Sequence, residues 1–300
     1  MIAATFPALL QRFFTDRLLQ QRQASPHTIA GYRDTFRLLL RFAAERLGRA
    51  PSVLTVDDLT PAFIAEFLDH LQRARGNSIR TRNARLAAIH SFAQYVAVNE
   101  PAHALHCQRL LALPSQRYER KLVAFLTPAE IDALLASPDP STWIGCRDRT
   151  LLLVAIQTGL RVSELIGLTR VDVVLGPGAH VQCVGKGRKH RGTPLRREAV
   201  TALEQWLRRH AGVPGDWIFP SVRGGPLSRD AVERLVARYA SAAATRCPSL
   251  TRKRVTPHVL RHSTAMNLLR HGVDRAVIAL WLGHESVETT QMYLHADLQL

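Results

Sequence analysis

The chain has 300 residues, of which 46% are hydrophobic, so it can build packed cores and is not globally disordered. Lysine and arginine number 40 against 24 acidic residues, which gives a formal net charge of +16. Nucleic acid is the commonest polyanion that such an excess attracts, although a basic solvated surface is a simpler alternative. No apolar run reaches the length of a membrane span, no basic signal-peptide region opens the chain, and the four cysteines form no CxxC pair. These features argue against a membrane protein and against a disulfide scaffold, and they predict a cytoplasmic protein.

The first third of the chain is predicted to be helical and to form a domain over residues 1–113. Ser25 before Pro26, and Thr60 before Pro61, are typical helix starts, and apolar residues follow each at helical spacing. A further helix is predicted over residues 78–97, and it begins with a basic stretch. Three arginines of that stretch are candidates for contacts with DNA phosphates, with a plain solvated helix face as the equal alternative: Arg80, Arg82 and Arg85.

A polar, charged stretch with Pro114 predicts a linker over residues 114–121, and a second domain follows over 122–300. This domain begins with a capping box, Thr127 to Glu130. A helix then ends at Gly159, an alternating segment with a glycine-rich turn predicts a small antiparallel β-hairpin, and the remainder is again helical. The predicted fold class is mainly α with a small antiparallel sheet.

Two arginine motifs could hold an anion. In TPHVLRH, Thr256 caps a helix, so His258 and Arg261 lie one turn apart near its positive end. In TGLRVSEL, Arg161 opens a helix, and Glu164 one turn later could orient the guanidinium. Arginine can clamp two oxygens of one phosphate, but each motif alone is also compatible with common surface chemistry.

The hairpin VGKGRKHRG carries two of the four lysines in the chain, and one of them, Lys186, lies between two glycines at its tip. A lysine can give up its proton when its surroundings lower its pKa, so this position suggests proton transfer. The other basic residues of the hairpin fit contacts with a DNA backbone better: Arg188, Lys189 and Arg191.

The final motif is LGHESVETTQMYLHAD, in which Gly283 is predicted to end a helix, His284 lies on the turn, and Tyr293 lies on the next helix. A free phenol has a pKa of about 10 and is a poor nucleophile unless neighbouring cations stabilise its charge. An isolated tyrosine is more often a packing residue, so the functional interpretation depends on the other motifs.

The sequence departs at particular positions from the motifs of other enzyme classes. HESVE is not the HExxH of zinc peptidases, and GKGRKHRG has neither the GxGxxG spacing nor the P-loop ending. The four motifs contain no cluster of carboxylates for a two-metal nuclease. The sequence therefore predicts no metal and no cofactor.

In order, context and spacing, the motifs resemble the tyrosine recombinase (phage integrase) family, with Xer-type recombinases and integrases of mobile elements the nearest in kind. The N-terminal helices resemble that family's core-binding domain, and the second domain its catalytic domain. The positions that carry the resemblance are Arg161, Lys186, His258, Arg261, His284 and Tyr293.

The resemblance implies a site-specific recombinase that cuts and rejoins double-stranded DNA through a 3′-phosphotyrosine. Tyr293 would be the nucleophile, Lys186 the general acid, and Glu164 a supporting residue. Arg161 and Arg261 would hold the phosphate oxygens, with His258 and His284 assisting. Four protomers, identical or paired with a related recombinase, would assemble on two DNA sites.

Two rival functions stay open from the sequence: a type IB topoisomerase-like relaxing activity, and a catalytically silent DNA-binding accessory protein. One departure from the family concerns the end of the chain, because only seven residues follow Tyr293. Family members usually carry a further helix there that docks on a neighbouring protomer, so communication between protomers is expected to differ. The lack of a separate arm-binding domain before the helical domain suggests a simple recombinase.

Overall fold

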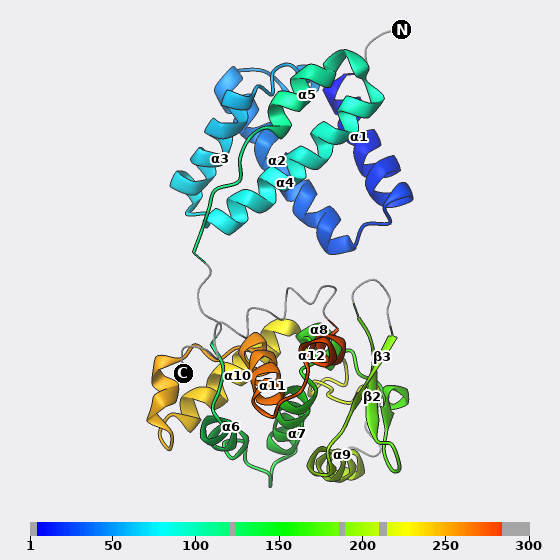
Figure 1. Cartoon of the computed structure of the whole chain (residues 1–300), viewed down its shortest axis with the longest axis vertical. Helices are drawn as coiled ribbons and strands as arrows, with labels where there is room; N and C mark the ends of the chain where they lie inside the picture. Colours follow the sequence, from blue (N-terminus) through cyan, green and yellow to red (C-terminus); the bar gives the residue numbers. More distant parts are fainter. Residues whose placement is uncertain (1–4, 120–123, 186–189, 210–214, 284–300) are drawn as a thin grey trace. The chain divides into compact units, whose positions relative to one another are not determined.

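A computed structural model describes residues 5–119, 124–185, 190–209 and 215–283. The chain divides into two compact units, Met1–Arg120 and Lys121–Leu300 (Figure 1). Within the ranges described, none of the helices combines the length and apolar character needed to cross a bilayer. The fold class predicted from the sequence, mainly helical with a small antiparallel sheet, is confirmed.

The first unit consists of helices that start where the sequence provides a cap. The side chains of Ser25, Thr60 and Ser78 each accept a hydrogen bond from a backbone N–H in the first turn of the following helix. The elements in chain order are α1 (Phe6–Arg12), the π-helical η1 (Phe13–Gln21), α2 (Pro26–Leu47), η2 (Pro51–Val53), α3 (Pro61–Arg75), α4 (Ile79–Asn99), η3 (Pro101–His103) and α5 (Ala104–Leu111).

Aromatic rings fill the core of this unit. Phe13 lies at the centre, with its ring in edge-on contact with Phe36 and Phe92 at centroid distances of 6.2 and 5.5 Å. The helix α5 was not anticipated, because the periodic pattern of apolar residues weakens after Pro101. It forms because Cys107 and Leu110 are buried against the same core.

The second unit contains α6 (Pro128–Leu135), α7 (Trp143–Thr158), α8 (Val162–Ile166), η4 (Arg170–Asp172), β1 (Val173–Val174), β2 (His180–Val184), β3 (His190–Pro194), α9 (Arg197–Arg209), α10 (Arg229–Ala243), η6 (Pro248–Arg252), α11 (Pro257–Arg270) and α12 (Arg275–Leu282). The predicted capping box at the start of α6 is present: Thr127 accepts from the Glu130 N–H and donates its own N–H to the Glu130 carboxylate.

The sheet has the order β1-β2-β3 and is antiparallel throughout. The β2–β3 pair is the predicted hairpin, with Cys183 opposite Arg191 and Val184 opposite His190. The two-residue strand β1 was not anticipated, because two residues carry no periodicity to detect. Arg191 is therefore the second residue of β3.

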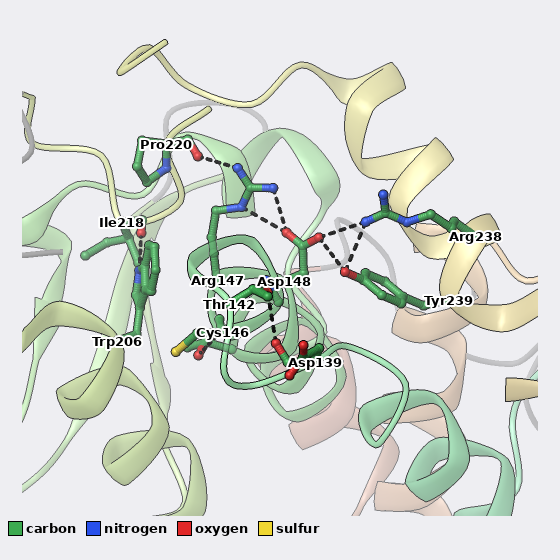
Figure 2. A network of polar contacts seen from close by, with 12 residues as sticks. Asp139, Thr142, Cys146, Arg147, Asp148, Trp206, Ile218, Pro220, Arg238 and Tyr239 are labelled. Atoms are coloured by element: carbon green, nitrogen blue, oxygen red, sulfur yellow. Dashed lines mark hydrogen bonds and ion pairs between the residues drawn. The ribbon is translucent and has the colours of Figure 1, made fainter. Parts of the chain in front are cut away.

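Helix α7 is the central element of the second unit, and it contacts α9 and α11 (Figure 1). Two of its buried polar residues, Arg147 and Asp148, belong to one network (Figure 2). Asp148 is fully buried and accepts hydrogen bonds from Arg147, Arg238 and Tyr239, while Arg147 also donates to the Pro220 carbonyl at 2.8 Å. The network ties α7 to α10 and to the segment that follows α9.

Candidate active site

Arg161 follows the sharp turn that ends α7. Gly159 closes that helix with a φ of +63°, a conformation that favours glycine. A Cβ at this position would also lie 2.6 Å from Cδ2 of Leu282, so the turn can approach α12 closely only because residue 159 has no side chain. The turn therefore presents Arg161 to the C-terminal end of α12, where its Nη2 donates to the Gly283 carbonyl at 2.8 Å.

Glu164, on the first turn of α8, is held by two arginines. Arg161 donates to it through its backbone N–H at 2.8 Å and through Nη1 at 2.9 Å. Arg191 of β3 binds both carboxylate oxygens, with distances of 3.2 Å to Oε1 and 2.8 Å to Oε2. Burial by itself raises the pKa of the Glu164 carboxyl, but these hydrogen bonds and the Arg191 charge outweigh it and lower the pKa overall.

Arg261 lies on α11, one turn after the Thr256 cap, which accepts from the Val259 N–H. The residue is 4% exposed, and its guanidinium donates to the Gly159 carbonyl and to the Leu282 carbonyl, both at 2.6 Å. Arg161 and Arg261 thus bind the adjacent carbonyls of Gly283 and Leu282. Two guanidinium groups that are 100 positions apart in the sequence meet at one helix end.

His258 projects from the same helix as Arg261 and has a positive environment. Desolvation, followed by the charges of Arg261, Arg229 and Arg161, lowers the pKa of His258 below its ordinary value. The ring of His262, one turn further along, stacks on it with a centroid distance of 5.9 Å and an interplanar angle of 19°. Burial, helped by His258 and Arg261, lowers the pKa of His262 to about 4.

Several predicted site residues lie outside the described part of the chain: Lys186, Arg188, Lys189, His284 and Tyr293. Gly283 is the last described residue before the final segment, and it ends α12 with a φ of +65° as the sequence predicted. Tyr293 follows it by ten positions in the sequence. The described part of the site therefore comprises Arg161, Glu164, Arg191, His258 and Arg261.

The three arginines proposed as phosphate contacts on α4 have different environments. Arg80 is exposed and lies over the Tyr118 ring, 5.5 Å from its centroid. Arg82 is only 8% exposed and faces Asp69, and Arg85 pairs with Asp34 at 3.0 Å. The burial of Arg82 differs from the expectation of a phosphate-facing side chain, because helical spacing alone did not reveal its neighbour Asp69 on α3.

Arg191 also differs from its expected place at the DNA surface. Its side chain is 11% exposed, and both terminal nitrogens bind Glu164. Its partner could not be identified from the sequence, because the two residues are 27 positions apart on different elements. His262 was given no role from the sequence, although its spacing of four positions after His258 indicated a shared helix face.

Among the described residues, no group of three or more His, Cys, Asp or Glu side chains could hold a metal ion. The charged groups that do converge there are guanidinium groups and one carboxylate. Such an arrangement suits an oxyanion with several oxygen acceptors, since guanidinium groups bind phosphate through paired N–H donors.

Comparisons with known proteins agree with this geometry. Residues 124–299 match the model of the phage integrase family, and residues 10–99 match that of the phage integrase N-terminal SAM-like domain. A protein of Sinorhizobium fredii named as an integrase/recombinase, y4rC, is 53% identical over 297 residues, covering 99% of this chain and 90% of that protein. The tyrosine recombinase XerD of Yersinia pestis is 34% identical over 292 residues, covering 94% of this chain and 91% of XerD.

Among solved structures, the XerH site-specific recombinase bound to its palindromic difH substrate superimposes with a TM-score of 0.74. The match has 24% identity and covers 93% of this chain and 79% of that one, and it supports the fold. With a family model that covers most of the second unit and full-length relatives above 30% identity, the chain belongs to the phage integrase family, the tyrosine recombinases.

Proposed function

We propose that this chain is a site-specific DNA recombinase in which Tyr293 attacks a scissile phosphodiester and forms a 3′-phosphotyrosine. The phenolic oxygen bonds to phosphorus as the bond to the 5′-oxygen breaks, and the released strand carries a 5′-hydroxyl. One P–O bond replaces another, so the energy for rejoining is retained and no nucleotide hydrolysis is needed. Attack by the 5′-hydroxyl of another strand reverses the step and completes an exchange.

The observation that carries this proposal is the meeting of Arg161 and Arg261 on consecutive carbonyls at the end of α12. The chain that leaves this helix end contains His284 and, nine positions later, Tyr293. A phosphate bound by the two guanidinium groups would therefore lie at the helix end from which the chain continues to the proposed nucleophile. Fixed cations at this place stabilise the negative charge that develops on the phosphate oxygens during attack.

The other side chains have complementary roles in this proposal. His258, whose pKa is lowered by desolvation and the neighbouring arginines, is neutral at pH 7 and can accept the proton of the attacking phenol. Lys186 donates a proton to the departing 5′-oxygen, and His284 donates a hydrogen bond to the phosphate. Glu164 orients Arg161 through two hydrogen bonds. Arg188, Lys189 and Arg80 are proposed to contact the DNA backbone.

Strand exchange between two sites requires a nucleophile for each of the four strands. We therefore propose that four protomers act together, all copies of this chain or pairs with a related recombinase. The net charge of +16 favours double-stranded DNA as the partner, and movement of a mobile element is one role compatible with the relatives. We expect the protein in the cytoplasm, in contact with its DNA substrate.

A suicide duplex tests the chemistry. Footprinting on the DNA that flanks the coding sequence first locates the bound site. The same site is then made with a nick beside the scissile phosphate, so that the short cleaved end diffuses away and the covalent complex accumulates. Incubation in EDTA should give a protein–DNA band resistant to denaturation with wild type and none with Tyr293→Phe.

A matched control is Tyr118→Phe, which removes another phenolic oxygen from an exposed ring and should leave the band unchanged. A wild-type protein that binds the site but never forms the band would contradict the proposal and indicate a DNA-binding protein without chemistry. A mixture of two differently labelled sites then distinguishes exchange, which yields recombinant products, from relaxation, which does not.

A further inference from the structure

The arginine pair around Glu164 raises a question of charge. Glu164 has a side chain only 5% exposed, and it contacts Arg161, the residue that is expected to bind the phosphate. A buried carboxylate beside a phosphate-binding guanidinium would neutralise it and repel the substrate. In this site a second guanidinium, that of Arg191, also binds the Glu164 carboxylate and offsets its negative charge.

The two arginines share the carboxylate unequally. Arg191 spans both oxygens with its two terminal nitrogens and is 11% exposed, whereas Arg161 is 30% exposed and also donates to Gly283. Arg191 thus lies on the buried side of Glu164 and Arg161 on the accessible side. The three groups together carry one positive charge, and it is located on the side that a substrate can reach.

We infer that Arg191 is a positioning residue that neutralises Glu164, so that Arg161 keeps a full positive charge for the scissile phosphate. This inference rests on the proposed function and adds a residue that acts through Arg161 rather than on the DNA. Arg191 also lies against Gly283, where a Cβ would come within 2.5 Å of its Nη1. The arginine therefore packs on the same helix end that receives Arg161.

Charge counting makes the inference testable with three variants. Arg191→Met leaves Glu164 with Arg161 as its only counter-ion, so the cluster changes from one positive charge to none. Adding Glu164→Gln to this variant restores one positive charge without restoring the guanidinium. Arg191→Lys keeps the charge but cannot span both oxygens. A matched control is Arg197→Met, which removes an exposed arginine at the start of α9.

The measurement is the single-turnover rate of covalent-complex formation on the suicide duplex, with DNA affinity and thermal unfolding determined in parallel. Arg191→Met should cleave about 10- to 100-fold more slowly than wild type, because it weakens the charge of a phosphate donor whose removal costs about 10²- to 10³-fold. The double variant Arg191→Met with Glu164→Gln should recover at least half of that loss on a logarithmic scale. Arg191→Lys should retain most of the activity, and Arg197→Met all of it.

A second substrate shows whether Arg191 acts through the phosphate charge. A methylphosphonate at the scissile position lacks one anionic oxygen, so it depends less on the guanidinium groups. The deficit of Arg191→Met should shrink on this substrate, as should that of Arg161→Met. A merely structural role for Arg191 would leave the deficit equal on both substrates.

The outcomes separate the two proposals. Absence of a covalent band with wild type would overturn the proposed function and this inference together. An intact wild-type band with no rescue by Glu164→Gln, or with Arg191→Lys as slow as Arg191→Met, would overturn only the role of Arg191. If Arg191→Met does not fold, Arg191→Gln replaces it in the same comparisons on both substrates, because glutamine also removes the positive charge.

Discussion

Position 283 requires glycine for two reasons. It ends α12 with a φ of +65°, and its missing side chain leaves room for the Arg191 guanidinium, which a Cβ would meet at 2.5 Å. We expect Gly283→Ala to lower the free energy of unfolding by about 1 kcal/mol through backbone strain, and further through displacement of Arg191. Because Arg161 donates to the Gly283 carbonyl, covalent-complex formation on the suicide duplex should also fall at least about tenfold.

Gly272 provides the matched control for this substitution. It has a φ of +74° in the same unit, and nothing lies within 4 Å of the position a Cβ would take. Gly272→Ala should therefore show the strain in urea unfolding but cleave DNA like wild type. Equal cleavage by the two variants would show that room for Arg191 beside Gly283 does not matter for catalysis.

His262 should make the stability of the second unit depend on pH. Burial holds the pKa of its folded form at about 4, whereas the unfolded form titrates near 6.5. Between these values the unfolded chain binds the proton more readily, so stability is lost as the pH falls through this window. For one such group, the free energy of unfolding falls by up to about 2 kcal/mol as the pH decreases from 6.5 to 5.

The variant His262→Gln cannot bind that proton, so its stability relative to wild type should improve on acidification. The measurement is urea unfolding of both proteins at several pH values between 5 and 7.5, where the difference in unfolding free energy should change in favour of the variant as the pH decreases. A difference that stays constant with pH would show that His262 titrates normally in the folded protein.

At the residue level, the sequence identified groups by their local spacing but not by their partners. Arg161 and Glu164 were paired correctly because they lie one helical turn apart. Arg191 and Arg82 were expected at the DNA surface, and the structure buries both beside carboxylates. A guanidinium 27 residues from its carboxylate gives no local signal, so only the tertiary fold could reveal it.

At the level of elements, helix starts were predictable because a cap is local chemistry. Ser25, Thr60, Thr127 and Thr256 all accept the expected backbone hydrogen bonds. The helix α5 and the strand β1 were missed because they depend on packing and pairing with distant segments. The convergence of the helix ends of α7, α11 and α12 was likewise invisible to local patterns, although it brings Arg161 and Arg261 together.

The Asp148 network should be a strong determinant of how α7 and α10 stay together (Figure 2). Asp148 is fully buried, and the Arg147 side chain is 8% exposed, so removal of the carboxylate charge leaves a buried guanidinium without its counter-ion. We expect Asp148→Asn to lower the free energy of unfolding by about 3–5 kcal/mol. Urea unfolding of the full chain, followed by far-UV circular dichroism, measures the effect.

Tyr239→Phe tests the same network more gently, because it removes one hydrogen bond of 2.9 Å to Asp148 and leaves the ion pair in place. Its expected cost is about 1 kcal/mol. If Asp148→Asn cost no more than Tyr239→Phe, the ion pair would add nothing beyond an ordinary hydrogen bond, and the role given to the buried charge would be wrong.

For the whole molecule, the net charge of +16 predicts that DNA binding depends steeply on salt. Each neutralised phosphate releases a counter-ion and contributes about −0.9 to the slope of log K against log salt concentration. With about six phosphate contacts, affinity for a random duplex should fall roughly 10³-fold between 50 and 200 mM salt. Fluorescence anisotropy with a labelled duplex measures the slope, and a nearly flat dependence would contradict an electrostatic interface.

Two arginines of α4 show which surface contributes to that slope. Arg80 is exposed, whereas Arg82 is 8% exposed and faces Asp69. Arg80→Ala should therefore make the slope shallower by about 0.9, while Arg82→Met should leave it unchanged in protein that circular dichroism shows to be folded. The opposite pattern, a shallower slope for Arg82→Met alone, would mean that Arg82 leaves Asp69 to reach a phosphate when DNA binds.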